Sequence, residues 1–188
     1  MNIHDERDMI VDYVINSKNV ELALKIGASF DKIRERIIVV FLKNLETALK
    51  DRLNNDWAIE NSLIKNVFDH WRRISIAKKN WNDKYNIGIS SEKHGARGFI
   101  IGILKGNEKQ EIIKDDILRK ALDNYKKGLQ SPYWEWYINC EGHFKDWDNE
   151  EVLLSMHKYD GKSDIYFMNE IMNIKDIAEP IIDKYLGI

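Results

Sequence analysis

The sequence contains few of the residues that cross-link, kink or anchor a chain. Its 188 residues include one cysteine, Cys140, and two prolines. A lone cysteine excludes an internal disulfide framework, and we expect a reducing compartment. The longest apolar run, IIVVFL at 37–42, is far shorter than the roughly 20 residues that cross a bilayer. Because the first residues are polar and acidic, unlike a secretory signal, we expect a cytoplasmic protein with no membrane partner.

Net charge is also small, −2, but it is unevenly distributed. Residues 72–97 contain seven Lys and Arg residues against two acids, a net +5, whereas residues 129–188 contain five against twelve, a net −7. Such asymmetry indicates either an anionic partner for the basic segment or attraction between the two segments within one fold. The near balance of total charge favours the second interpretation.

The first 53 residues show helical periodicity, clearest over 29–53, where apolar residues recur every three or four positions. Beyond Asn55 the period shortens to two, which is typical of strands. Strands are predicted over 57–63, 71–79, 85–90, 98–104 and 133–140, and helices over 111–128, from Asp148 to about His157, and over 165–186. Asp148 and Glu151 match a capping box, and Pro180 is expected to kink or break the last helix.

These elements predict an α+β fold. We expect one domain over 1–188, in which a helical amino-terminal segment, 1–53, precedes the sheet and carboxy-terminal helices, 57–188. Consecutive strands with short links favour an antiparallel meander of four to five strands, with helices packed on one side.

The stretch YNIGISSEKHGARGFIIGIL, residues 85–104, predicts a β-hairpin. Pairing Gly88 with Gly102 leaves a five-residue loop, 93–97, in which Gly95 can adopt a positive φ. Facing glycines in neighbouring strands indicate a close approach there, and we expect a packed helix rather than a ligand.

The loop and the neighbouring basic segment supply candidate phosphate contacts. The candidates are Arg72, Arg73, Lys78, Lys79, Lys84, Lys93, His94 and Arg97. The competing interpretation is a solvated turn. HGARG lacks the spacing and the context of a P-loop.

The sequence gives little indication of a metal site, a reactive cysteine or an aromatic stacking platform. Cys140 and His143 have the C-x-x-H spacing of half a metal site, but there is no second cysteine and the remaining histidines form no paired spacing, so we expect no metal and no cofactor. Cys140 is interpreted as a buried hydrophobe. Trp134 and Trp136 could form a stacking platform, although burial in the core is favoured.

A family resemblance covers about the last 160 residues. The predicted helix over 29–53 and the Trp-bearing strand after it are part of the resemblance, and its main segments lie from about Trp81 onward. It rests on YNIGI (85–89), FIIGI (99–103), YWEWY (133–137) and DWDNEEVL (146–153). These segments resemble the carboxy-terminal region of a group of bacterial and phage proteins of the PD-(D/E)XK nuclease superfamily. In that group the amino-terminal half is a metal-dependent nuclease core, and the resembled part is an accessory region.

The nuclease motif itself is not matched. That motif needs an Asp and then Asp/Glu-x-Lys on the next strand, because two carboxylates hold Mg²⁺ and the lysine supports the attacking water. The sole acid-x-Lys here is Asp160-Gly161-Lys162, in a predicted turn. The resemblance therefore implies an accessory module without the nuclease half, and no catalytic residue carries over.

Three functions follow from these observations. The first is a non-catalytic module that binds a protein or nucleic-acid partner in bacterial or phage nucleic-acid metabolism or defence. The second is a divergent Mg²⁺-dependent nuclease or another hydrolase, with candidates among Asp160, Lys162, Cys140, His143 and His94. The third is a homo-oligomeric structural protein whose amino-terminal helices or tryptophans bury themselves against a second copy.

Overall fold

A computed structural model describes residues 3–16, 18–106, 113, 116–158 and 162–188. The chain divides into two compact units, 1–36 and 37–188. The first unit contains α1 (Ile3–Asn16), α2 (Val20–Ala28) and the start of α3 (Phe30–Arg52). No helix among the described residues is both long and apolar enough to cross a membrane.

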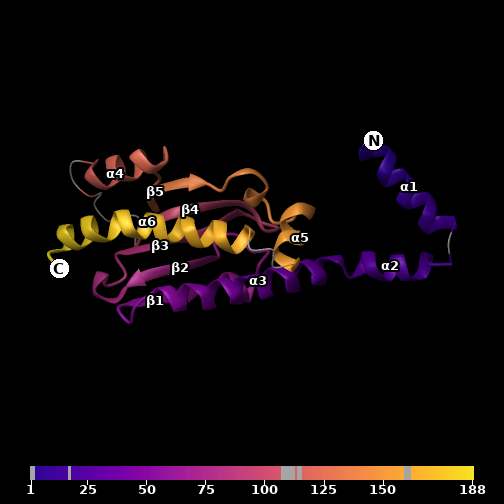
Figure 1. Cartoon of the computed structure of the whole chain (residues 1–188), viewed down its shortest axis with the longest axis horizontal. Coiled ribbons are helices and arrows are strands. Elements are labelled where there is room, and N and C mark those ends of the chain that lie inside the picture. Colours follow the sequence, from indigo (N-terminus) through magenta and orange to yellow (C-terminus); the bar gives the residue numbers. More distant parts are fainter. Residues whose placement is uncertain (1–2, 17, 107–112, 114–115, 159–161) are drawn as a thin grey trace. The chain divides into compact units, whose positions relative to one another are not determined.

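The second unit is built on a five-stranded antiparallel sheet in the order β1-β2-β3-β4-β5 (Figure 1). The strands are β1 (Trp57–Asn61), β2 (Arg73–Lys78), β3 (Tyr85–Lys93), β4 (Arg97–Lys105) and β5 (Trp134–Asn139). The helices that follow are α4 (Ile117–Tyr125), α5 (Glu150–Lys158) and α6 (Lys162–Leu186). The predicted α+β class, the meander and the preceding helical segment are confirmed.

The main core lies on one face of the sheet. Alternate positions of the strands, among them Ile76, Ile89 and Ile101, are fully buried against α3 and α6, whose Leu45 and Ile174 are also fully buried. This follows from the period of two in the strands and of 3.6 in the helices, which brings one apolar face of each element together. Each such side chain contributes about 1.5–3 kcal/mol through burial. The predicted helices on one side of the sheet are thus confirmed.

The hairpin has the predicted register. Gly88 pairs with Gly102, and Lys93 pairs with Arg97, which shortens the loop from the predicted five residues to three. A Cβ on Gly102 would lie 2.2 Å from the Trp136 carbonyl oxygen, and one on Gly88 would lie 2.3 Å from the Ile74 carbonyl oxygen. The expected helix at these glycines is therefore wrong: the backbones of the neighbouring strands make the close approach.

Three helix details also differ from the sequence predictions. Asn149, not Asp148, caps α5, because the Asn149 side chain accepts the N–H of Glu151 at 2.8 Å. Pro180 lies inside α6 without ending it. The described part of the predicted helix over 111–128 is helical over Ile117–Tyr125, and residues 111, 112, 114 and 115 lie outside the described residues.

Candidate functional site: an aromatic groove on the open face of the sheet

The opposite face of the sheet carries a second, smaller hydrophobic cluster. It consists of Ile100, Leu104 and Trp134, with Tyr137 packed against them. All four come from β4 and β5, and none of the described helices contributes to the cluster. We call this face the open face. Because side chains alternate along a strand, Arg73, Ser90 and Glu92 also lie on it.

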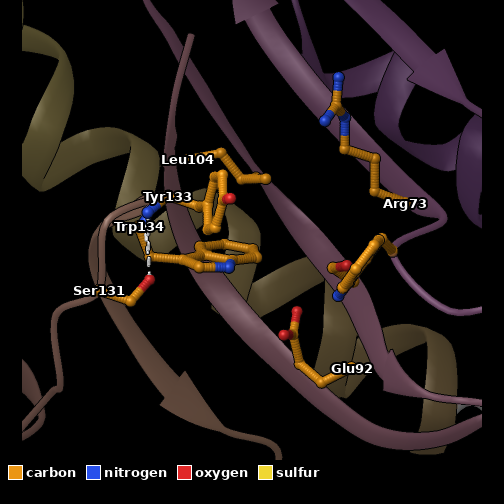
Figure 2. Close-up of a pocket in the computed structure, with 8 residues that line it drawn as sticks. Arg73, Glu92, Leu104, Ser131, Tyr133 and Trp134 are labelled. Carbon is orange, nitrogen blue, oxygen red and sulfur yellow. Dashed lines mark hydrogen bonds between the residues drawn. The ribbon is translucent and has the colours of Figure 1, made fainter. Parts of the chain in front are cut away.

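Two adjoining cavities hollow the open face. One has a volume of about 490 Å³ and is lined by aromatic, apolar and polar side chains from β2, β3, β4, β5 and the segments just before β2 and β5 (Figure 2). Its lining is Trp71, Arg73, Ser90, Glu92, Leu104, Ser131, Tyr133 and Trp134. The other, about 340 Å³, shares Glu92, Ser131 and Trp134 with the first. Together they form one aromatic groove, of a size that suits ligands.

The walls of the aromatic groove are exposed aromatic rings. Trp71 is 70% exposed and Tyr133 is 60% exposed, whereas Trp134 is nearly buried. The Ser131 hydroxyl accepts the N–H of Trp134 at 3.1 Å and fixes the turn that presents Tyr133 and Trp134. Large exposed aromatic side chains beside a cavity indicate a recognition surface.

Trp71 is also held in an unusual backbone conformation. Its φ is +59°, in the left-handed region that bulky residues avoid. Its N–H donates to the Ser91 carbonyl at 2.7 Å, so a sheet-like hydrogen bond holds the strained residue beside β3. Strain of this kind is retained where surrounding structure determines it, and it is common at binding sites.

Charged groups of both signs line the aromatic groove. Arg73 extends along the open face and forms an ion pair with Glu60 at 2.9 Å. Lys93 and Lys145 line the smaller cavity. Glu92 lies between the two cavities, and partial burial of its carboxyl raises its pKa above the usual 4.5 despite a hydrogen bond with Ser90.

The predicted cations do not form a single patch. Lys78 lies on the helix-covered face, where Glu179 accepts from it at 2.8 Å and Asp183 pairs with it as well. Lys79 donates to the Asn55 carbonyl at 2.6 Å. Lys84 forms no ion pair with any residue that the structure describes, and it lies at the turn before β3, at the other end of that strand from the loop.

The remaining predicted cations lie near the hairpin loop. Arg72 pairs with Asp69 at 3.1 Å, and Arg97 pairs with Asp148. His94 lies beside Asp69 and His70, a grouping that could hold a metal ion. Lys93 has no ion-pair partner in the described part of the chain and lies in the groove. Of the eight predicted cations, only Arg73 and Lys93 line the groove.

The candidates for catalysis are not brought together. Cys140 is buried, and this burial raises the pKa of its thiol, so it stays protonated. His143 lies in a short 3-10 turn and faces Glu151 at 3.5 Å, and His94 is in the hairpin loop. Asp160 lies outside the described residues, and α6 begins at Lys162.

Sequence reasoning missed two groups. Trp71 and Tyr133 fall within predicted strands, and periodicity does not distinguish a core aromatic residue from an exposed one. Trp136, by contrast, is fully buried as expected, and its indole N–H donates to Asp123 at 3.0 Å. His70 and His94 are 24 positions apart, and only the fold brings their rings to 4.0 Å between centroids.

Comparison of the chain with protein-family models, with curated proteins and with solved structures finds no match in any of the three. The resemblance to the accessory region of PD-(D/E)XK proteins therefore stays a prediction.

Proposed function

We propose that the chain is a non-catalytic binding module that holds single-stranded nucleic acid in the aromatic groove. The observation that carries this proposal is the pair of exposed rings, Trp71 and Tyr133, which line one cavity of about 490 Å³ on the open face. The interpretation agrees with the accessory role that the family resemblance implies. It gives that role a defined surface.

Stacking supplies the first part of the recognition. Each unpaired base has two π-faces, and stacking on a protein aromatic contributes about 1–3 kcal/mol per base. Trp71 and Tyr133 offer exposed rings, and the nearly buried Trp134 with Leu104 forms an apolar floor. Double-stranded nucleic acid fits this surface poorly, because its bases are already stacked on one another.

Charge supplies the second part. Lys93 and Lys145 line the smaller cavity next to the aromatic rings, whereas Arg73, at the larger cavity, is already paired with Glu60. Lysine and arginine neutralise backbone phosphates and release counterions, so binding weakens as salt rises. The chain's near-zero net charge means that this attraction has to be local, from the groove cations, rather than from the whole molecule.

The proposal is tested by titrating the full chain with a fluorescein-labelled single-stranded oligonucleotide, in DNA and RNA forms, at two salt concentrations. Wild-type protein should bind the oligonucleotide with a salt-dependent affinity. Binding should quench the tryptophan fluorescence of the protein. Trp71→Ala and Tyr133→Ala should each weaken binding by about five- to a hundredfold, which corresponds to the loss of one stacked base.

Matched controls distinguish the groove from the rest of the surface. Tyr185→Ala removes another exposed aromatic and Lys84→Ala another unpaired cation, and neither residue lines the groove. Both variants should bind like wild type. Equal weakening in the controls, or tighter binding of a duplex than of the single strand, would refute the assignment. Adding Mg²⁺ to the same titration tests the nuclease alternative, since cleavage that a chelator blocks would support that alternative instead.

A second proposal concerns the amino-terminal unit. In α2 none of the residues is buried, and Leu22 and Leu24 are 57% and 69% exposed. Helices this short are marginal in water without a packing partner. Residues 1–36 contain six Lys and Arg residues against seven acids, so two copies do not repel one another. We propose that α2 packs against a second copy of this chain.

A further inference from the structure

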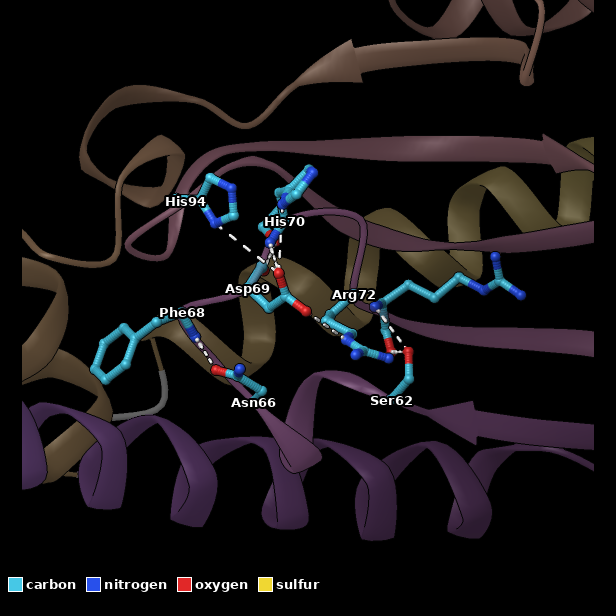
Figure 3. Close-up of polar contacts among 9 residues, drawn as sticks. Ser62, Asn66, Phe68, Asp69, His70, Arg72 and His94 are labelled. Atoms are coloured by element: carbon cyan, nitrogen blue, oxygen red, sulfur yellow. Dashed lines mark hydrogen bonds and ion pairs between the residues drawn. The ribbon is translucent and has the colours of Figure 1, made fainter.

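Three potential metal ligands meet at the hairpin loop. Asp69 and His70 lie in the loop between the 3-10 turn Leu63–Lys65 and β2, and His94 is the first residue of the β3–β4 loop (Figure 3). One ligand atom from each residue lies within 4.8 Å of the other two. The three side chains come from two separate loops, so the fold, not a local motif, creates the group.

Two hydrogen bonds hold the loop before β2 against β3 and the hairpin loop. The N–H of Gly95 donates to the Phe68 carbonyl at 2.8 Å, and the Ser91 hydroxyl donates to the Asp69 carbonyl at 2.9 Å. Bonds of this kind on both sides of the group position the ligands before any ion arrives. Preorganised ligands lose little conformational freedom on binding.

The ligand spacing is close to that around a tetrahedral ion. Metal–nitrogen and metal–oxygen bonds of about 2.0–2.2 Å at tetrahedral angles place two ligand atoms about 3.3–3.6 Å apart. Nδ1 of His70 lies 3.3 Å from Oδ1 of Asp69, and Nδ1 of His94 lies 3.9 Å from the same oxygen. His94 has a 73% exposed side chain, so a small rotation of its ring closes the longer distance.

The Asp69 carboxylate lies beside a ring nitrogen of His70. Nδ1 of His70 is buried and makes no hydrogen bond to any described residue, despite the nearby carboxylate. Arg72 Nε holds Oδ2 of Asp69 at 3.1 Å and so leaves Oδ1 toward the two imidazoles. Oδ1 of Asp69 also accepts the His70 backbone N–H at 3.0 Å, so both oxygens of the carboxylate are fixed in position.

We propose that Asp69, His70 and His94 bind one divalent transition-metal ion of the Zn²⁺ class. Two imidazoles and one carboxylate are typical ligands of Zn²⁺ and neighbouring first-row dications, whereas Mg²⁺ and Ca²⁺ prefer oxygen donors. Three protein ligands leave a fourth position for water or another ligand. The metal site does not depend on whether the aromatic groove binds nucleic acid.

The ion would join the hairpin loop to the loop before β2. It would also order one wall of the aromatic groove, because the His70 ring packs on Trp71 at 4.2 Å between centroids. Trp71 follows His70 directly in the chain and lines the larger cavity. Fixing the His70 ring therefore restricts the position of the neighbouring indole.

Isothermal titration of the full chain with ZnCl₂, after chelator treatment and desalting, tests the site. Wild type should bind one Zn²⁺ per chain, and Co²⁺ in place of Zn²⁺ should give the visible absorption bands of a tetrahedral ion. His94→Ala should weaken Zn²⁺ binding by at least about tenfold, since even the loss of an outer-shell partner costs about 10–100-fold. Asp69→Asn, which keeps an acceptor for Arg72, should weaken it similarly.

His143→Ala is the matched control, because His143 also faces a carboxylate but belongs to no group of three potential ligands among the described residues. This variant should bind Zn²⁺ like wild type. Zn²⁺ should raise the melting temperature of wild type and of His143→Ala, but not that of His94→Ala. The proposal is overturned if wild type binds no Zn²⁺ at micromolar concentrations, or if His94→Ala and wild type bind it equally.

Discussion

Arg97, the first residue of β4, forms an ion pair with Asp148, just before α5. Beside it, the Gly98 N–H donates to the Asp146 carboxylate at 2.8 Å and the Trp147 N–H donates to the Ala96 carbonyl at 2.9 Å. The end of the hairpin is therefore anchored to the acidic carboxy-terminal segment. Part of the charge asymmetry in the sequence is satisfied within the fold.

This anchoring predicts different contributions to binding from two neighbouring cations, Lys93 and Arg97. Lys93→Ala should weaken single-stranded oligonucleotide binding and reduce the salt dependence by about one released counterion, because Lys93 lies in the groove without an ion-pair partner among the described residues. Arg97→Ala should change affinity little, since Asp148 already neutralises that guanidinium. Affinities of both variants at several salt concentrations check this, and a larger loss for Arg97→Ala would contradict it.

Trp71 offers a test that separates binding from folding. Trp71→Gly removes the exposed indole and relieves a left-handed conformation that costs a non-glycine residue about 1 kcal/mol. Denaturant unfolding should show a stability equal to or above that of wild type, while oligonucleotide binding falls. As a contrast, Trp147→Ala should lower the free energy of unfolding by about 3–5 kcal/mol, because this fully buried indole stacks on Phe99.

Features that depend on the local period of apolar residues, such as strands and their register, could be predicted from the sequence. Features that depend on contacts between residues far apart in the chain could not. The alternation in YNIGI and FIIGI was sufficient for the Gly88–Gly102 register. The reason for those glycines was not accessible, because the atoms that crowd them belong to β2 and β5. Asp148 has the type and place of a helix cap, but a long-range partner, Arg97, occupies it while Asn149 caps α5.

The same limit applies to the candidate sites. A list of cations could not show that Lys78 lies on the helix-covered face with Glu179 and Asp183, which are 101 and 105 residues further along the chain. It also could not show that Trp71 is exposed while Trp81 and Trp136 are fully buried. Exposure and pairing are properties of the assembled sheet, which spacing along the chain does not report.

Leu24 tests self-association of the amino-terminal unit. If α2 packs on a second copy, light scattering of the full chain should give a mass above 22.2 kDa, and Leu24→Glu should return it to that value. A charge in the centre of an apolar contact is costly to bury, so one substitution is enough. Lys25→Glu, at a neighbouring exposed position, is the control and should leave the mass unchanged. A monomeric wild type would contradict the proposal.

Glu92 provides the sharpest test of the groove, because it is an acid where an anion is proposed to bind. Replacing it with glutamine should strengthen oligonucleotide binding at pH 7 by a few-fold, since the ionised carboxyl repels phosphate near Lys93.

The same substitution changes how the stability of the fold depends on pH. The pKa of Glu92 is raised in the folded chain, so the native state holds the proton more tightly than the unfolded state does. The contribution of Glu92 to stability is therefore greatest at acidic pH and falls as pH rises from 4.5 through the folded pKa. Wild type should lose more stability than Glu92→Gln over that interval in denaturant titrations.

Glu150→Gln, at the exposed start of α5, is the control and should change neither oligonucleotide binding nor the pH dependence of stability. If Glu92→Gln bound the oligonucleotide more weakly than wild type, Glu92 would instead be a contact to the ligand, and the groove would favour a cationic or hydrogen-bond-donating partner.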